Sequence, residues 1–173
     1  MPSEYGFRSF DDEMKERFGR KIYRLSLDGG MTCPNRDGTL GTGGCIFCSE
    51  SGSGEFSTPF QQEMDSQIEA AKWRVRQKIR NCGYMAYFQN HTNTYAPAEK
   101  LRALFSAVLA KPEIVALAIA TRPDCLDDEK IALLAELAQW KPIWVEFGLQ
   151  TIHPSTAQYI RRRCPLSIFD RCV

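Results

Sequence analysis

The sequence predicts an α/β fold in which strands and helices alternate around a parallel sheet. Strand-like segments begin near residues 84, 114 and 143, and this spacing of about 30 residues is the length of a strand–helix–strand unit. Residues 114–119 (IVALAI) are apolar on both faces, as in a strand that is covered on both sides of a sheet. Consecutive strands of this kind pair in parallel through right-handed crossovers.

Two patterns define the beginning of the chain. Ser9 and Asp12 match a capping box for a short helix that ends at Gly19. Residues 21–28 then alternate in polarity, which predicts a strand with one apolar face: Tyr23, Leu25 and Leu27.

The remaining elements follow from apolar periodicity. Thr58 and Pro59 are a typical helix start, and the helix they open has apolar residues at spacings of three and four: Phe60, Met64, Ile68, Ala71, Val75 and Ile79. The other elements are expected in alternation: a strand at 84–89, a helix at 97–110, the strand at 114–119, a helix at 127–140 and a strand at 143–149.

Polar motifs follow all four predicted strands. They are a cysteine-containing loop after 21–28, QNHTNT at 89–94, TRPD at 121–124 and QTIH at 150–153. In parallel α/β folds the chemistry gathers at the carboxyl ends of the strands. We therefore expect these motifs to converge on one rim of the sheet and to form a site there.

The cysteine loop carries the strongest chemical signal. Cys33, Cys45 and Cys48 lie in a glycine-rich loop over 29–58, which is too long to be an idle connection. Structural zinc sites and fully protein-ligated [4Fe–4S] clusters take four ligands. Three thiolates therefore predict a metal centre with one open position. The alternative is a zinc site completed by a fourth ligand: His91 or Cys82.

Other candidate residues have ordinary structural interpretations. We expect the remaining cysteines to act as small apolar fillers: Cys82, Cys125, Cys164 and Cys172. His91 and His153 are expected at a polar rim or at a helix cap. Glu146 lies inside an apolar strand, where a hydrogen-bonded buried carboxylate and a functional one are both consistent with the pattern.

The composition narrows the class of protein. With 173 residues and 43% apolar content, the chain is expected to form one globular domain. No apolar run reaches the ~18 residues of a membrane span, and residues 1–10 do not read as a secretory signal. The odd number of seven cysteines favours metal or redox chemistry over disulfides. We expect a cytoplasmic protein without a membrane segment.

Basic residues cluster locally, although the net charge is only +1. One group lies in a predicted helix and a second lies near the end of the sequence: Lys72, Arg74, Arg76, Lys78 and Arg80, and then Arg161, Arg162 and Arg163. Each group is either a solvated helix face or a patch that contacts RNA.

Five motifs in order resemble the YhcC/YtqA-like radical SAM family. They are CPNRDG at 33–38, GGCIFC at 43–48, TNTYAP at 92–97, TRPDC at 121–125 and VEFGLQT at 145–151. The chain is similar, more distantly, to the catalytic subunit of Elongator and to oxygen-independent coproporphyrinogen oxidase. The resemblance runs from about residue 17 to the end of the sequence.

The resemblance implies a partial (βα)6 TIM-like barrel and two cofactors. A [4Fe–4S] cluster would be held by Cys33, Cys45 and Cys48, with S-adenosylmethionine on the open iron. Reductive cleavage of S-adenosylmethionine would give methionine and a 5′-deoxyadenosyl radical that abstracts hydrogen from a substrate. The glycines at 41, 43 and 44 would let the loop fold closely around the cluster.

The resemblance also implies S-adenosylmethionine contacts for residues in the matching motifs: Phe47, Thr92, Asn93, Thr94 and Gln150. Phe47 would lie by the adenine, and Gln150 would approach from the fourth strand. Arg122 and Glu146 lie in matching motifs without an assigned contact. Relatives often have a glutamate where this chain has Ala120, a departure that bears on the ribose contacts.

The family's barrel has six units, whereas four strands are found here. We interpret residues 1–20 as an N-terminal helical extension and 21–173 as the N-terminal part of a radical SAM core, truncated after about four units, with 159–163 in a helix. Such a piece is expected to bind a cluster yet to catalyse poorly or not at all. Expected partners are a flavodoxin- or ferredoxin-type reductant and, from the Elongator-like motifs, tRNA. The alternatives are a zinc-stabilised binding module and an inactive remnant.

Overall fold

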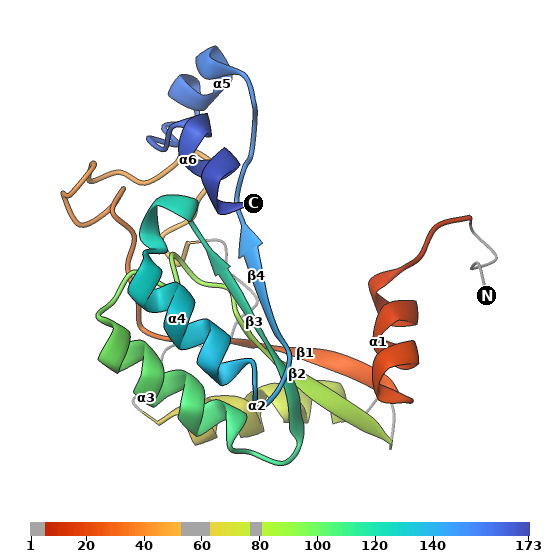
Figure 1. Cartoon of the computed structure of the whole chain (residues 1–173). Helices are drawn as coiled ribbons and strands as arrows, with labels where there is room; N and C mark the ends of the chain where they lie inside the picture. The colour runs from red at the N-terminus through yellow and green to blue at the C-terminus, as the bar shows by residue number, and fades with distance from the viewer. Residues whose placement is uncertain (1–5, 53–62, 77–80) are drawn as a thin grey trace.

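The computed structural model describes residues 6–52, 63–76 and 81–173. Its centre is one parallel sheet with the strand order β1-β2-β3-β4 (Figure 1): β1 (Lys21–Leu27), β2 (Cys82–Phe88), β3 (Ile114–Thr121) and β4 (Ile143–Phe147). Strands that follow one another in the sequence are neighbours in the sheet. The predicted α/β class and parallel pairing are confirmed, and closure into a barrel stays a prediction.

Three helices cover one face of the sheet (Figure 1): α2 (Met64–Arg76), α3 (Ala98–Leu109) and α4 (Asp128–Leu137). Their apolar stripes meet the sheet in the main core, where Phe88 and Phe105 pack with ring centroids 5.3 Å apart. β3 is buried along nearly its whole length, as its doubly apolar sequence predicts. This layer fixes the orientation of the sheet and leaves the other face for different contacts.

A smaller core forms on the opposite face. There α1 (Phe10–Phe18) inserts Met14, which is fully buried, against Ile22, Met85 and Ala116. The predicted capping box is present: Ser9 Oγ accepts from Asp12 N at 3.1 Å. Because α1 packs near the amino ends of the strands, side chains at the carboxyl ends of this face are left to line a pocket.

Several element boundaries differ from the sequence prediction. The strand expected at 143–149 ends at Phe147, since the backbone turns there and Gln150 adopts a φ of 64°. The helix expected from Thr58 is described only from Met64, so Thr58, Pro59, Phe60 and Ile79 lie outside the described residues. The prediction of a helix over 159–163 is wrong. Instead α5 (Pro154–Tyr159) ends first, and α6 (Leu166–Cys172) begins after a turn.

Hydrogen bonds join the four strand ends to one another. At the end of β1, Asp28 accepts from Asn90 Nδ2 at 2.9 Å, and the buried Gln67 of α2 binds both Asp28 N and Asp28 O. Asn93 Nδ2 donates to Phe88 O and Ala120 O, both at 3.0 Å. These bonds align the loops into the common rim that the sequence predicts.

The rim continues from β3 to β4. Thr94 and Thr121 pair through their hydroxyls at 2.6 Å, and Thr94 Oγ1 also donates to Cys125 O. Gly148 N donates to Thr121 O at 3.3 Å. Thus every strand end is bonded to the next one along the sheet.

No helix in the described part of the chain is both long enough and apolar enough to span a bilayer.

The amide of Asn93 should be a major contributor to stability. Asn93→Ala would remove the side-chain donor of Phe88 O and leave Ala120 O with only the backbone N–H of residue 93, which costs about 1–3 kcal/mol of unfolding free energy. Urea denaturation measures this, with the exposed Asn81→Ala as a matched control expected within about 0.5 kcal/mol of wild type. Equal stability of the two variants would contradict the structural role.

Candidate functional site

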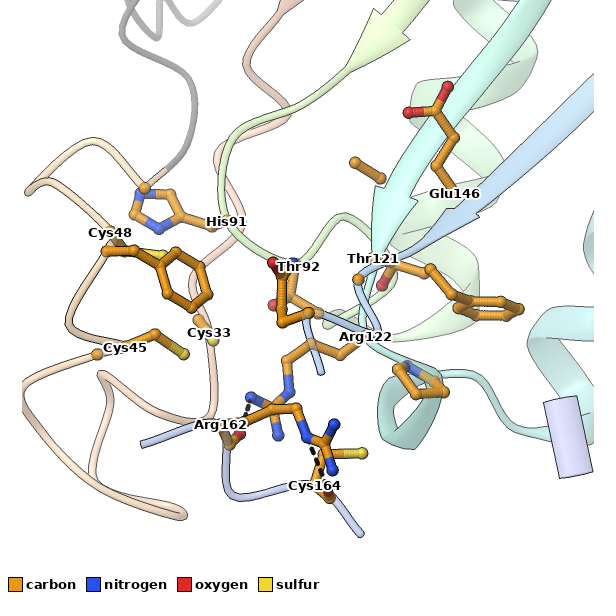
Figure 2. A pocket seen from close by; sticks show the side chains of 18 of the residues that line it. Cys33, Cys45, Cys48, His91, Thr92, Thr121, Arg122, Glu146, Arg162 and Cys164 are labelled. Carbon is orange, nitrogen blue, oxygen red and sulfur yellow. Dashed lines mark hydrogen bonds between the residues drawn. The ribbon is translucent and has the colours of Figure 1, made fainter. Parts of the chain in front are cut away.

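A pocket of about 300 Å³ opens at the carboxyl ends of the strands. All three loop cysteines line it, together with residues from each of the other strand ends (Figure 2). His91 and Thr92 come from the loop after β2, Thr121 and Arg122 from β3 and its end, and Glu146 from β4. The convergence that the sequence predicts is therefore present.

The backbone of the cysteine loop explains how residues so far apart in sequence share one pocket. Cys33 O accepts from Arg36 N at 2.8 Å, which starts a tight turn. Pro34 O then accepts from Leu40 N, and Asn35 O accepts from Gly44 N at 2.8 Å. The chain between Cys33 and Cys45 is thereby folded back on itself, so that Cys45 returns to the neighbourhood of Cys33.

Arg36 holds the second half of the loop. Its guanidinium donates to the backbone oxygens of Cys48 and Glu50, each at 3.4 Å, and to Ser49 O. Gly44 has a φ of 69°, and a Cβ there would lie 3.1 Å from Arg36 Nε. A glycine at this position therefore permits both the turn and the close approach of the arginine.

A distant segment of the chain closes the loop from the other side. Ile46 N donates to Ile160 O at 3.3 Å, and Arg163 Nη1 donates to Leu40 O at 2.9 Å. A Cβ on Gly41 would lie 1.1 Å from Arg163 Nη1. Gly41 and Gly44 thus permit close packing of arginine side chains of this chain, and the expectation that glycines 41, 43 and 44 let the loop fold closely around a cluster stays a prediction.

The second basic group is not a solvated helix face. Arg162 is only 8% exposed, and it donates to the backbone oxygens of Leu149, Thr151 and Cys164. Arg161 and Arg163 are exposed, both with positive φ. Only these two can contribute charge to a surface patch, so an RNA contact here would be smaller than the sequence predicts.

The first basic group is only partly described. Lys72 contacts Glu69 and Glu113 at 2.7 and 3.1 Å. Lys78, Arg80 and the side chain of Arg76 lie outside the described residues.

Three arginines form part of the pocket wall. Arg122 forms a two-point pair with Asp124, at 2.9 and 2.7 Å, and also donates to Arg162 O at 2.9 Å. Arg36 and Arg162 line the same pocket. Cations around thiols favour the thiolate form, which is the form that binds metal.

Cys45 and Cys48 form an unequal thiol pair. The hydrogen bond from Cys48 lowers the pKa of Cys45 to about 6, with smaller contributions in the same direction from Asn35, Arg122 and Arg163. The pKa of Cys48 is raised because its proton is held by Cys45. At neutral pH one of the two sulfurs is therefore a thiolate.

Glu146, Tyr87 and Arg24 form a polar network on the sheet below the pocket. Tyr87 donates to Glu146 Oε2 at 2.8 Å, and Arg24 pairs with Glu146 Oε1 at 3.0 Å. Burial, together with the bond to Glu146, raises the pKa of Tyr87 to about 12. Glu146 is thus hydrogen-bonded, yet its side chain is 37% exposed and faces the pocket.

The predicted S-adenosylmethionine residues separate into two sets. Phe47, Thr92 and Gln150 line the pocket. Asn93 and Thr94 are fully buried, do not line it, and use their side chains to join the strand ends. Both side chains therefore hold the strand ends together. A side-chain contact of either one with the cofactor stays a prediction.

The zinc alternative had two candidates for the fourth ligand, and the structure does not place one of them, Cys82, at the pocket. Cys82 pairs in register with Lys21 at the amino ends of the strands, whereas the pocket lies at their carboxyl ends. His91 does line the pocket. Within the described ranges, no three His, Cys, Asp or Glu side chains form a group that could hold a single metal ion.

The other cysteines and His153 are largely as expected. Cys125 and Cys164 are buried, whereas Cys82 and Cys172 are half-buried. Cys164 also borders the pocket, but it lies beyond Arg162 from the cysteine triplet (Figure 2). His153 occupies the N-cap position of α5 without a side-chain capping bond.

Sequence reasoning missed the residues that hold the loop in place. Asn35 and Arg36 lie within the CPNRDG motif, so their position in the motif was the available signal. Arg162 gave no such signal, because an arginine in a basic run is ordinary, and the same is true of Tyr87 in the Glu146 network, since a tyrosine in a strand is ordinary.

Comparison with known proteins agrees with this geometry. The family described as the radical SAM superfamily matches residues 36–173. The chain belongs to the radical SAM superfamily. It is 46% identical to the protein YtqA of Bacillus subtilis over 160 residues, covering 92% of this chain and 50% of YtqA.

Two further relatives extend the comparison. YhcC of Escherichia coli is 37% identical over 163 residues (94% of this chain, 52% of YhcC), and MJ0486 of Methanocaldococcus jannaschii is 35% identical over 165 residues (91% and 48%). These similarities support a YhcC-like radical SAM family. The chain spans about half the length of the curated relatives it matches. The similarity to Elongator and to coproporphyrinogen oxidase stays a prediction.

A glycine pair tests the packing of the loop. Gly41→Ala should displace the Arg163 guanidinium and break its bond to Leu40 O, at a cost of about 0.5–1.5 kcal/mol. Gly43→Ala is the matched control, since its Cβ would lie 3.5 Å from Arg161 Nη1, an ordinary contact. Chemical denaturation should show a lower unfolding free energy for Gly41→Ala only, and equal losses would contradict the assignment.

The thiol pair predicts a shifted pH profile of alkylation. In the metal-free chain, Cys45 should be protonated well below pH 6 and react as a thiolate above it, with half-maximal rate near the pKa of about 6. Cys48→Ala removes the largest cause, so the half-maximum should move up toward the ordinary thiol value of about 8.5. Iodoacetamide labelling at Cys45, followed by mass spectrometry, measures this. A Cys48→Ala profile identical to wild type would refute the pairing.

Proposed function

We propose that the chain binds a [4Fe–4S] cluster through Cys33, Cys45 and Cys48 and belongs to an enzyme that cleaves S-adenosylmethionine reductively. The observation that carries this proposal is the convergence of three thiols from one loop on a pocket at the strand ends. When bound, the cluster would supply the electron for C–S bond cleavage, and the resulting 5′-deoxyadenosyl radical would abstract hydrogen from a substrate.

The donor set fits such a cluster. Soft thiolate ligands select iron–sulfur clusters or zinc over hard cations. A [4Fe–4S] cluster takes its thiolates on separate iron atoms, so it needs thiols around a cavity rather than around one point. Cys33, Cys45 and Cys48 fit this requirement in that all three border the same pocket.

Charge and unsatisfied polar atoms of the pocket also support a bound group. Arg36, Arg122 and Arg162 surround it, which favours the negative charge of thiolates and of a carboxylate. In the described structure, the buried Nδ1 of His91 has no hydrogen-bond partner. Burial, with a smaller contribution from Arg36, lowers the pKa of His91, so this ring is neutral at pH 7. A buried orphan of this kind beside a pocket suggests a missing ligand.

The chain's own residues would position the second cofactor. Phe47 is 50% exposed at the pocket and offers a ring face for adenine. Thr92 and Gln150 offer polar side chains from two other strand ends. Glu146 lies beside Ala120 in the register of β3 and β4, so a carboxylate is present near the position where relatives carry one.

The proposal needs two partners. A flavodoxin- or ferredoxin-type protein would supply the electron. We keep tRNA as the proposed substrate, with the exposed Arg161 and Arg163 beside the cysteine loop as the available cations.

Anaerobic reconstitution with iron and sulfide tests the proposed function. We expect about four irons and four acid-labile sulfides per chain and an EPR signal of the reduced cluster that changes when S-adenosylmethionine is added. Substituting alanine for Cys33, Cys45 or Cys48 should abolish cluster uptake. Cys82→Ala is the matched control, because Cys82 lies at the opposite edge of the sheet, and it should retain the cluster.

The other outcomes are distinct. Colourless protein with about one zinc per chain that is lost in His91→Ala would favour the zinc-stabilised module. Uptake of neither metal would mean an inactive remnant. A cluster that ignores S-adenosylmethionine would refute the cofactor assignment and leave the cluster assignment intact.

A further inference from the structure

The side chain of Asn35 contacts the sulfur of a proposed cluster ligand. Asn35 is fully buried, and its Nδ2 lies 3.3 Å from Cys45 Sγ, 2.9 Å from Arg161 O and 3.2 Å from Arg162 O. Two N–H groups are therefore shared among one sulfur and two carbonyl oxygens. Among the described residues, Asn35 is the one whose side chain contacts both a cysteine sulfur and the two carbonyl oxygens of residues 161 and 162.

The orientation of the amide follows from its neighbours. Carbonyl oxygens can only accept, so the NH2 group and not Oδ1 must face Arg161 O and Arg162 O. The same nitrogen then faces Cys45 Sγ. In the described structure Oδ1 is buried without a partner. An amide held this way costs stability, which makes a role other than packing worth testing.

The main chain of Asn35 adds to this restraint. Asn35 O accepts from Gly44 N at 2.8 Å, and Gly44 directly precedes Cys45. One residue thus holds Cys45 through both the backbone beside it and its sulfur. The distance between the amide and the sulfur is therefore fixed by the fold of the loop.

We propose that Asn35 is a positioning residue that raises the reduction potential of a cluster bound at Cys45 and couples that potential to the segment at 161–162. The proposal rests on the proposed function. A hydrogen bond to a ligating sulfur stabilises the more negative, reduced cluster, and hydrogen bonds to the sulfurs are among the factors that set such potentials. Because Nδ2 is shared with Arg161 O and Arg162 O, a shift of these carbonyls changes its bond to the sulfur.

The test compares two asparagines that differ in one contact. Asn35→Ala removes the N–H···S bond. Asn90→Ala makes the same chemical change at another buried rim amide, whose Nδ2 donates to Asp28 at 2.9 Å and not to a cysteine. Both variants and the wild type are reconstituted anaerobically. Iron and sulfide per chain are measured first, and the midpoint potential follows from a redox titration monitored by EPR.

Asn35→Ala should make reduction of the cluster about tenfold less favourable, a shift of about 59 mV to more negative potential for one electron. Asn90→Ala should keep the wild-type potential. Hydrogen exchange of the metal-free chains should be faster over residues 160–163 in Asn35→Ala than in Asn90→Ala, because the bonds to Arg161 O and Arg162 O are lost.

Each other result decides against the proposal. Equal potentials in Asn35→Ala and wild type would refute the role of the N–H···S bond. Equal shifts in both variants would show general loosening of the rim. Unchanged exchange over 160–163 would refute the coupling. If the wild-type chain takes up no cluster, the proposed function itself has failed and this inference fails with it. A wild-type cluster whose potential ignores Asn35 overturns the inference alone.

Discussion

The rest of the structure depends on one constraint: the polar backbone groups at the carboxyl ends of four parallel strands need hydrogen-bond partners once loops cover them. An unpaired buried carbonyl or amide costs more than most single contacts contribute. At the end of β1, Gln67 bonds both backbone groups of Asp28, and farther along the rim Asn93 Nδ2 bonds Ala120 O and Gly148 N bonds Thr121 O. The pocket lies at these same carboxyl ends of the strands.

This constraint divides the polar residues of the rim between support and function. A side chain that is fully buried and bonded to backbone, such as Asn93, supports the rim through its Nδ2, whereas its Oδ1 has no hydrogen-bond partner in the described structure. Its neighbour Thr92 is almost as buried, at 1% exposed, but it borders the pocket. Two residues in one short motif therefore differ in their place relative to the pocket, although the sequence presents them alike.

Much of the fold and part of the site could be predicted from the sequence. Periodicity and strand spacing predict the strands, and the loop cysteines predict the site, because both are local patterns. The buried place of Arg162 could not be predicted, since it depends on carbonyls of Leu149 and Thr151 that are exposed only when the strand ends at Phe147. The same holds for Asn35, whose partners at 161–162 lie more than a hundred residues away.

The cysteine loop is not an independent unit, although its three thiols lie within sixteen residues of sequence. The backbone oxygens of residues 160–162 accept hydrogen bonds from the loop, and Arg163 donates to Leu40 O within the loop. Because Arg122 at the end of β3 also binds Arg162 O, the last segment links the third strand end to the loop. The positions of the thiols therefore depend on the segment after β4 as well as on the loop. A change in either would alter the position of Cys45.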